Sequence, residues 1–187
     1  TGVGPGTRCG GVMAYDDARG KLVLFSGKGT GGAWANYDNQ TWEWDATNGW
    51  VQIASTLSPD PRWLMNGSAV DVPGLGVVFH GGNAWDATGA GYISNETWAW
   101  FGSTWVPLST SGPVIGNHSM VHRPAPHNDL ILFGGNNGSA TSDTWRFDLG
   151  TSTWTQVITA TTPYPGTGVT GHLSYYNPIT DKVIVHG

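Results

Sequence analysis

One short aromatic pattern occurs three times in this chain of 187 residues. It reads TWEWD at 41–45, TWAWF at 97–101 and TWRFD at 144–148. In a β-strand, residues two apart lie on the same face, so the two aromatic side chains of each copy share one face. A further tryptophan follows each copy after a short polar segment, at Trp50, Trp105 and Trp154. Each copy therefore predicts a β-hairpin with a large aromatic face.

A set of apolar segments recurs with a similar period. Four runs end in glycine, and they read KLVLFSG at 21–27, GVVFHGG at 76–82, LILFGG at 130–135 and DKVIVHG at 181–187. Aligned on Gly27, Gly81, Gly135 and Gly187, the runs are 54, 54 and 52 residues apart. A strand-like stretch precedes each run, with turn-forming residues between the two. These pairs predict a second kind of hairpin in each repeat.

Four short strands in a repeat of about 50 residues predict the blades of a β-propeller. Neighbouring blades diverge outward from the axis, and flat side chains on the outer strands fill the widening gap. The repeated aromatic residues are thus first of all structural wedges. The predicted fold class is all-β, with blades at 8–57, 62–108 and 112–157 and a half-blade at 165–187.

Composition agrees with this class and argues against others. Only 11% of the residues are charged, while glycine (29) and tryptophan (11) are abundant, and good helix formers are scarce. The net charge of −5 without a basic cluster argues against nucleic-acid binding, and no apolar run is long enough to span a membrane. The single Cys9 cannot form an internal disulfide. Low lysine with high threonine, serine and asparagine favours an extracellular or virion-surface location and leaves a cytoplasmic one open.

The sequence resembles the kelch-repeat β-propellers. The resemblance covers nearly the whole chain and rests on apolar strands ending in Gly or Gly-Gly, followed by N-x-T-W-x-W or S-D-T-W-x-F and by T-W-x-x-L-like segments. The copies differ in places, because Ser26 and His80 stand where the third copy has Gly134. The family includes oxidases, lyases, adaptors and actin-binding proteins, so the resemblance implies a fold and no single activity. Its usual six or seven blades imply a larger ring, completed by further blades or by another chain.

Long polar loops on one face of the predicted propeller carry the candidate binding residues. These aromatic residues lie outside the repeat columns: Trp34, Tyr37, Trp63, Trp85 and Tyr92. Aromatic side chains beside Asn, Asp and Gly suit sugar stacking or a protein contact, and loops on a rigid scaffold are common binding sites. The alternative is that these loops pack on their own aromatic side chains.

Three polar residues complete the candidate ligand contacts, namely Arg8, Arg62 and His80. In kelch adaptors, arginines near the innermost strand line the ligand-binding mouth, so the resemblance implies an anionic partner for Arg8 and Arg62. A salt bridge to a neighbouring blade is the alternative.

No pattern of catalytic or metal-binding residues stands out. His118 and His122 would lie about 13 Å apart along a strand, too far for one ion. The kelch oxidases use a cysteine crosslinked to a tyrosine, and Cys9 has no matching Tyr-His context. We therefore expect no metal or cofactor, and a non-enzymatic module that binds a glycan or protein. Two alternatives stay open, a structural component of a larger surface or virion complex and a fragment of a kelch-type enzyme with its active site in missing blades.

Overall fold

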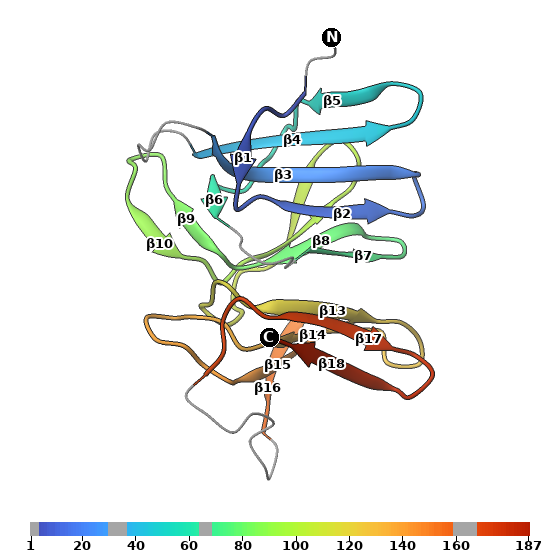
Figure 1. Ribbon diagram of the computed structural model, residues 1–187, viewed down its shortest axis with the longest axis vertical. Coiled ribbons are helices and arrows are strands. Elements are labelled where there is room, and N and C mark those ends of the chain that lie inside the picture. Colours follow the sequence, from blue (N-terminus) through green and yellow to red (C-terminus); the bar gives the residue numbers. More distant parts are fainter. Residues whose placement is uncertain (1–3, 30–36, 64–68, 159–167) are drawn as a thin grey trace.

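Every regular element of the described chain is a β-strand. The computed structural model describes residues 4–29, 37–63, 69–158 and 168–187. The strands form four sheets of blade type and one small extra sheet (Figure 1). The predicted all-β class with four-stranded antiparallel sheets is confirmed. Within the same ranges, no helix could cross a membrane.

Each of the first three blades has four antiparallel strands in sequence order. Blade 1 contains β2 (Val12–Asp16), β3 (Lys21–Gly29), β4 (Tyr37–Asp45) and β5 (Gly49–Ile53). Blade 2 contains β7 (Ala69–Val72), β8 (Gly76–His80), β11 (Thr97–Trp100) and β12 (Trp105–Ser109). Blade 3 contains β13 (Ser119–Arg123), β14 (Asp129–Phe133), β15 (Thr144–Asp148) and β16 (Thr153–Val157). The half-blade contains β17 (Leu173–Asn177) and β18 (Lys182–His186).

The remaining strands lie at one end of the blades. The loop sheet has the order β10-β9-β6 and contains β6 (Arg62–Trp63), β9 (Asn83–Trp85) and β10 (Gly91–Ile93). Strand β1 (Arg8–Cys9) pairs with the last residues of β3. At the centre, the innermost strands β2, β7, β13 and β17 follow one another side by side (Figure 1). The loop sheet lies at one end of these strands, and their short hairpin turns lie at the other.

The core consists of two apolar layers, one at each junction between complete blades. Between blades 1 and 2 the layer includes Phe25, Phe79, Trp100 and Trp105, and between blades 2 and 3 it includes Phe147. Apolar residues on both faces of strands such as β8 and β14 are buried, because each sheet is covered on two sides. The blades therefore depend on one another for burial of their side chains.

The second aromatic residue of each repeated pattern shows this dependence directly. Trp100 and Phe147 are fully buried against the preceding blade, whereas Trp44, in the same position of blade 1, is 39% exposed. All three lie on strands that pair in the same way within their blades. Their burial is thus decided by whether a preceding blade covers them.

A hydrogen bond joins successive blades at a repeated position. The indole Nε1 of Trp105 in blade 2 donates to Thr41 Oγ1 in blade 1 at 2.9 Å. Trp154 in blade 3 donates in the same way to Thr97 in blade 2 at 2.9 Å. The threonine that opens one copy of the pattern therefore accepts a hydrogen bond from the tryptophan that follows the next copy. We call this contact the Thr–Trp bond.

Strand pairing shifts the second repeat by one residue relative to the alignment on Gly27, Gly81 and Gly135. The threonines of T-W-x-W pair with Phe25, His80 and Phe133, so His80 occupies the phenylalanine column. The next two residues have positive φ in all three blades, and they are Ser26 and Gly27, Gly81 and Gly82, Gly134 and Gly135. Gly82, rather than Gly81, is thus the partner of Gly27. The sequence could not reveal this, because two successive glycines both fit a positive-φ position.

Candidate functional site

A groove on the loop sheet is lined by three of the predicted aromatic residues. Trp63 comes from β6, Trp85 from β9 and Tyr92 from β10. The groove has a volume of about 540 Å³, and the rest of its lining is small, apolar or uncharged: Asn83, Ala84, Gly89, Gly91 and Ile93. We call it the aromatic groove. It forms because the three short strands pair in register at one end of the blades.

The indole of Trp63 lies directly over the backbone of Gly10. A Cβ atom built at Gly10 would lie only 1.7 Å from Trp63 Cδ1, so a side chain there would displace the ring. Gly10 also has a φ of 71°, which glycine adopts without strain. On the other side of the strand, β6 pairs with β9, with Trp63 opposite Asn83. Trp63 is thus held by the chain that precedes blade 1 and by the neighbouring strand.

Trp85 is supported by an aromatic stack. Its ring centroid lies 3.9 Å from that of Tyr37, with an angle of 15° between the ring planes. The Nζ of Lys28 lies 5.5 Å from the centroid of Tyr37. Tyr37 is only 9% exposed, and burial raises the pKa of its hydroxyl. Tyr37 therefore supports the groove and does not line it.

Tyr92 is the most exposed aromatic side chain of the groove, at 40%. Its hydroxyl donates to Asp60 Oδ2 at 2.8 Å. Burial of the hydroxyl and this bond to a carboxylate raise the pKa of Tyr92, so the phenol stays protonated at neutral pH. Asp60 is thereby a positioning residue for the ring. No local pattern could reveal it, because the two residues are 32 positions apart.

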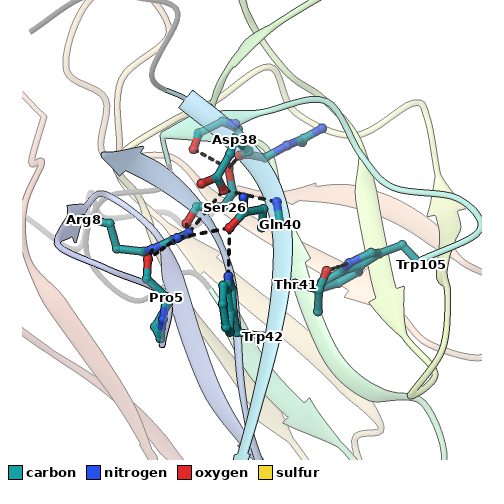
Figure 2. A network of polar contacts seen from close by, with 9 residues as sticks. Pro5, Arg8, Ser26, Asp38, Gln40, Thr41, Trp42 and Trp105 are labelled. Carbon is teal, nitrogen blue, oxygen red and sulfur yellow. Dashed lines mark hydrogen bonds and ion pairs between the residues drawn. The ribbon is translucent and has the colours of Figure 1, made fainter. Parts of the chain in front are cut away.

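Arg8 is held by groups of β3, of β4 and of the chain before β1, as Figure 2 shows. Its Nη1 donates to the backbone oxygen of Ser26 at 3.0 Å and to Asp38 Oδ1 at 3.2 Å. Its Nε and Nη2 donate to the backbone oxygen of Pro5, and Nη2 also reaches Gln40 Oε1 at 3.4 Å. The side chain of Arg8 is 11% exposed. The guanidinium thus joins the chain before blade 1 to the end of β3 and does not line the aromatic groove.

Arg62 repeats this arrangement in blade 2 with complete burial. Its side chain is 0% exposed, and Nη1 donates to the backbone oxygen of Gly81 at 3.2 Å. Its Nη2 lies 3.2 Å from Glu96 Oε2. The guanidinium therefore faces a carboxylate and backbone oxygens of its own chain. Of the two roles expected from the sequence, this geometry favours the internal ion pair over contact with an anionic ligand.

Loss of this ion pair is expected to be costly, because a charge without water needs its partner. Glu96→Ala should lower the free energy of unfolding by roughly 3 kcal/mol, since it leaves the Arg62 guanidinium buried without a counterion. Asp38→Ala, which removes the partner of the less buried Arg8, should cost about 1 kcal/mol. Denaturant unfolding of both variants tests the difference. Equal losses of stability in the two variants would contradict the expectation that the more buried ion pair costs more to break.

His80 lies inside the blade 2–blade 3 junction and is fully buried. Its Nε2 lies 2.9 Å from the backbone oxygen of Pro113, which only accepts, so Nε2 carries the proton. Its Nδ1 then accepts from Thr97 Oγ1 at 2.9 Å, and Thr97 in turn accepts the Thr–Trp bond from Trp154. Burial lowers the pKa of His80 to about 4. The imidazole is therefore a neutral internal link at physiological pH, away from the groove.

The other predicted sites divide between described and undescribed parts of the chain. Trp34 lies outside the described residues. Among the residues that are described, no group of three or more histidine, cysteine or acidic side chains could hold a metal ion. Trp63, Trp85 and Tyr92 come together in one groove, with Tyr37 behind them. Their role in binding stays a prediction.

The comparisons with known proteins agree with this architecture. A family model described as the kelch motif matches residues 125–157, which include β14, β15 and β16 of blade 3. The chain has the kelch-type propeller fold. The solved structure titled "Structure of YjhT" is similar to 99% of this chain, with a TM-score of 0.69 and 17% identity. This chain spans 60% of the length of that one. No curated protein matches it by sequence.

Proposed function

We propose that this kelch-type chain is a binding module that takes up an uncharged glycan in the aromatic groove. The observation that carries the proposal is the convergence of Trp63, Trp85 and Tyr92 on one groove. The apolar face of a sugar ring stacks on an indole or phenol, and its hydroxyl groups bond to nearby polar atoms. Asn83, in the lining, offers both a donor and an acceptor.

The charge of the groove supports a neutral ligand. None of the described lining residues is charged, and Arg62, which directly precedes Trp63, is buried in its pair with Glu96. A phosphate or sulfate group would find no cation there to balance it. An uncharged saccharide requires none. The location that fits this ligand is a cell or virion surface, and it is part of the same proposal.

Contacts behind the three aromatic rings hold them in place before a ligand binds, so binding loses little side-chain entropy. Trp63 rests on Gly10, and Trp85 is stacked on Tyr37. Tyr92 is held through its hydroxyl by Asp60. A ligand therefore meets side chains that already have one arrangement, which lowers the entropy lost on binding.

A glycan array followed by calorimetry tests the proposal. Trp63→Ala and Trp85→Ala should each weaken binding of the glycan found on the array at least tenfold, or about 1.4 kcal/mol, because each removes a stacking surface. Trp44→Ala is the matched control, since Trp44 is an exposed tryptophan of blade 1 outside the groove. Near-ultraviolet circular dichroism confirms folding. An array without a hit, or affinities unchanged in both groove variants, would reject the proposal.

A second candidate function is assembly with another chain. The half-blade exposes apolar side chains of its inner strand, with Leu173 60% and Tyr175 55% exposed. A blade packed against this sheet would cover them, and a further strand could pair with the outer edge of β18. Sedimentation across a concentration series tests this candidate, because an assembly component should associate in the micromolar range. A single monomer at all concentrations would reject it.

A further inference from the structure

A second groove runs along the innermost strands, which Figure 1 shows side by side, and reaches the turns at the ends away from the loop sheet. It has a volume of about 630 Å³ and draws residues from β2, β7, β13 and β17 and from the turns that follow them. We call it the axial groove. Its walls are largely apolar and include Met13, Val70, Met120 and Tyr176. No part of the aromatic groove contributes to it.

The charges at the axial groove have one sign. Asp17 and Asp71 belong to its lining, which contains no lysine or arginine. The described lining also contains two other titratable groups, His122 and Tyr176. The pKa of His122 is lowered chiefly by burial, so the imidazole is neutral at pH 7. The pKa of Tyr176 is raised chiefly by its hydrogen bond to Asp181, so the phenol is neutral as well. The lining thus combines apolar walls with two carboxylates and no cation.

The surroundings offset the repulsion at this pair only in part. Burial and the nearby carboxylates of Asp16 and Asp17 raise the pKa of Asp71. A backbone hydrogen bond from Asp17 and the charge of Arg19 lower the pKa of Asp71, but its net shift is upward. Two nitrogens of Arg19 are already bound to other carboxylates, because its Nε donates to Asp16 Oδ2 at 2.8 Å and its Nη1 to Glu43. Like charges close together destabilise each other, and a cation placed between them relieves the repulsion. The groove is therefore electrostatically complementary to a positive group.

We propose that the axial groove receives a basic side chain of a protein partner, with the alkyl stem against Met13 and Met120 and the positive group at Asp17 and Asp71. Lysine and arginine bury their methylene stems on apolar surface while the charged end reaches a polar partner. Methionine side chains adapt to such stems because they are unbranched and polarizable. The site is independent of the glycan proposal, since the two grooves share none of their described lining residues.

Arginine suits the two carboxylates better than lysine. Its planar guanidinium presents several N–H donors, and these can serve Asp17 and Asp71 together. The partner segment therefore carries an arginine with apolar neighbours. A free small cation shares the same chemistry but lacks the peptide that would contact the apolar walls.

In the test, the acetylated and amidated tripeptide Leu-Arg-Leu is titrated into the folded chain. Binding is followed through the NMR signals of the methionine methyl groups. Saturable shifts of the Met13 and Met120 signals are expected. Replacing arginine by citrulline, which keeps the shape and removes the charge, should weaken binding at least tenfold. N-propylguanidinium should bind at least tenfold more weakly than the peptide. Shifts as large with citrulline would overturn the proposal, and equal affinity for the small cation would overturn its peptide part.

Substitutions of the carboxylates complete the test. Asp17→Asn should weaken binding of the tripeptide at least fivefold. The fold should stay intact, because Asp17 is an exposed turn residue. Asp71→Asn should have a similar effect, with circular dichroism as the check on folding. Asp86→Asn, at an exposed aspartate that directly follows β9 and lies outside the axial groove, should leave affinity unchanged. Unchanged affinity in Asp17→Asn, or an equal loss in Asp86→Asn, would overturn the proposal.

Discussion

Acidification from pH 7 to pH 4 is expected to destabilise the protein by roughly 3 kcal/mol through His80 alone, because its pKa falls from 6.5 to about 4 on folding. The unfolded chain binds a proton at His80 more strongly than the folded chain does. The contribution of His80 is therefore fully present above pH 6.5 and decreases as the pH falls toward 4. In the neutral form, both ring nitrogens already have hydrogen-bond partners, Pro113 and Thr97, so burial penalises the added charge without a new bond to offset it.

His118 should add to this acid sensitivity. It is fully buried, and its ring centroid lies 5.8 Å from that of His80. Burial and the neighbouring His80 and His172 hold its pKa well below 6.5. Neither of its ring nitrogens has a hydrogen-bond partner among the described residues. Protonation would place an uncompensated charge at the junction of blades 2 and 3, so unfolding is favoured.

Chemical denaturation at pH 7 and pH 4 measures the effect. The comparison is between the wild-type chain and His80→Gln, because glutamine does not titrate and its amide can still donate to the Pro113 oxygen. All carboxylates titrate equally in both proteins, so they cancel in the difference. The variant should lose roughly 3 kcal/mol less stability between the two pH values. The same loss in both proteins would show that His80 titrates normally.

Trp105→Ala is expected to lower the free energy of unfolding by about 4 kcal/mol, a large part of the stability of a typical domain. Trp105 is fully buried between blades 1 and 2. Its ring centroid lies 4.8 Å from that of Phe25 and 5.1 Å from that of Phe79. Removing the indole leaves a cavity at the point where two blades share their core.

Smaller substitutions separate the packing from the Thr–Trp bond. Thr41→Val keeps the volume at position 41 and leaves the Trp105 N–H buried without an acceptor, which should cost about 1–2 kcal/mol. Trp44→Ala should cost about 2 kcal/mol, less than Trp105→Ala, because this tryptophan is 39% exposed. Denaturant unfolding gives all three values. A loss at Trp44 as large as that at Trp105 would contradict the wedge role of the repeated aromatic residues.

The wedge role itself could be predicted from the sequence, and the burial of individual wedges could not. Trp44, Trp100 and Phe147 have the same place in the repeat, yet only the latter two are buried. The repeat fixes which face of a strand is aromatic. Whether another sheet covers that face depends on the neighbouring blade.

The candidate site was partly predictable for a similar reason. Trp63, Trp85 and Tyr92 stand out because they interrupt the repeat, and the structure brings all three to one groove. Their supports do not stand out, since Gly10 lies beneath Trp63 and Asp60 holds Tyr92 across long separations in the sequence. The sequence contains no local sign of such pairs.

The sequence by itself determined the all-β blades, because side chains in a strand alternate between faces and the spacing of aromatic residues shows that alternation directly. Only the tertiary structure decided which polar side chains point inward. Arg62 and His80 looked like ligand contacts, and they are buried against Glu96 and Pro113 instead. The physical reason is that a buried charge or imidazole needs a partner, and that partner comes from a segment that folding, not local sequence, brings alongside.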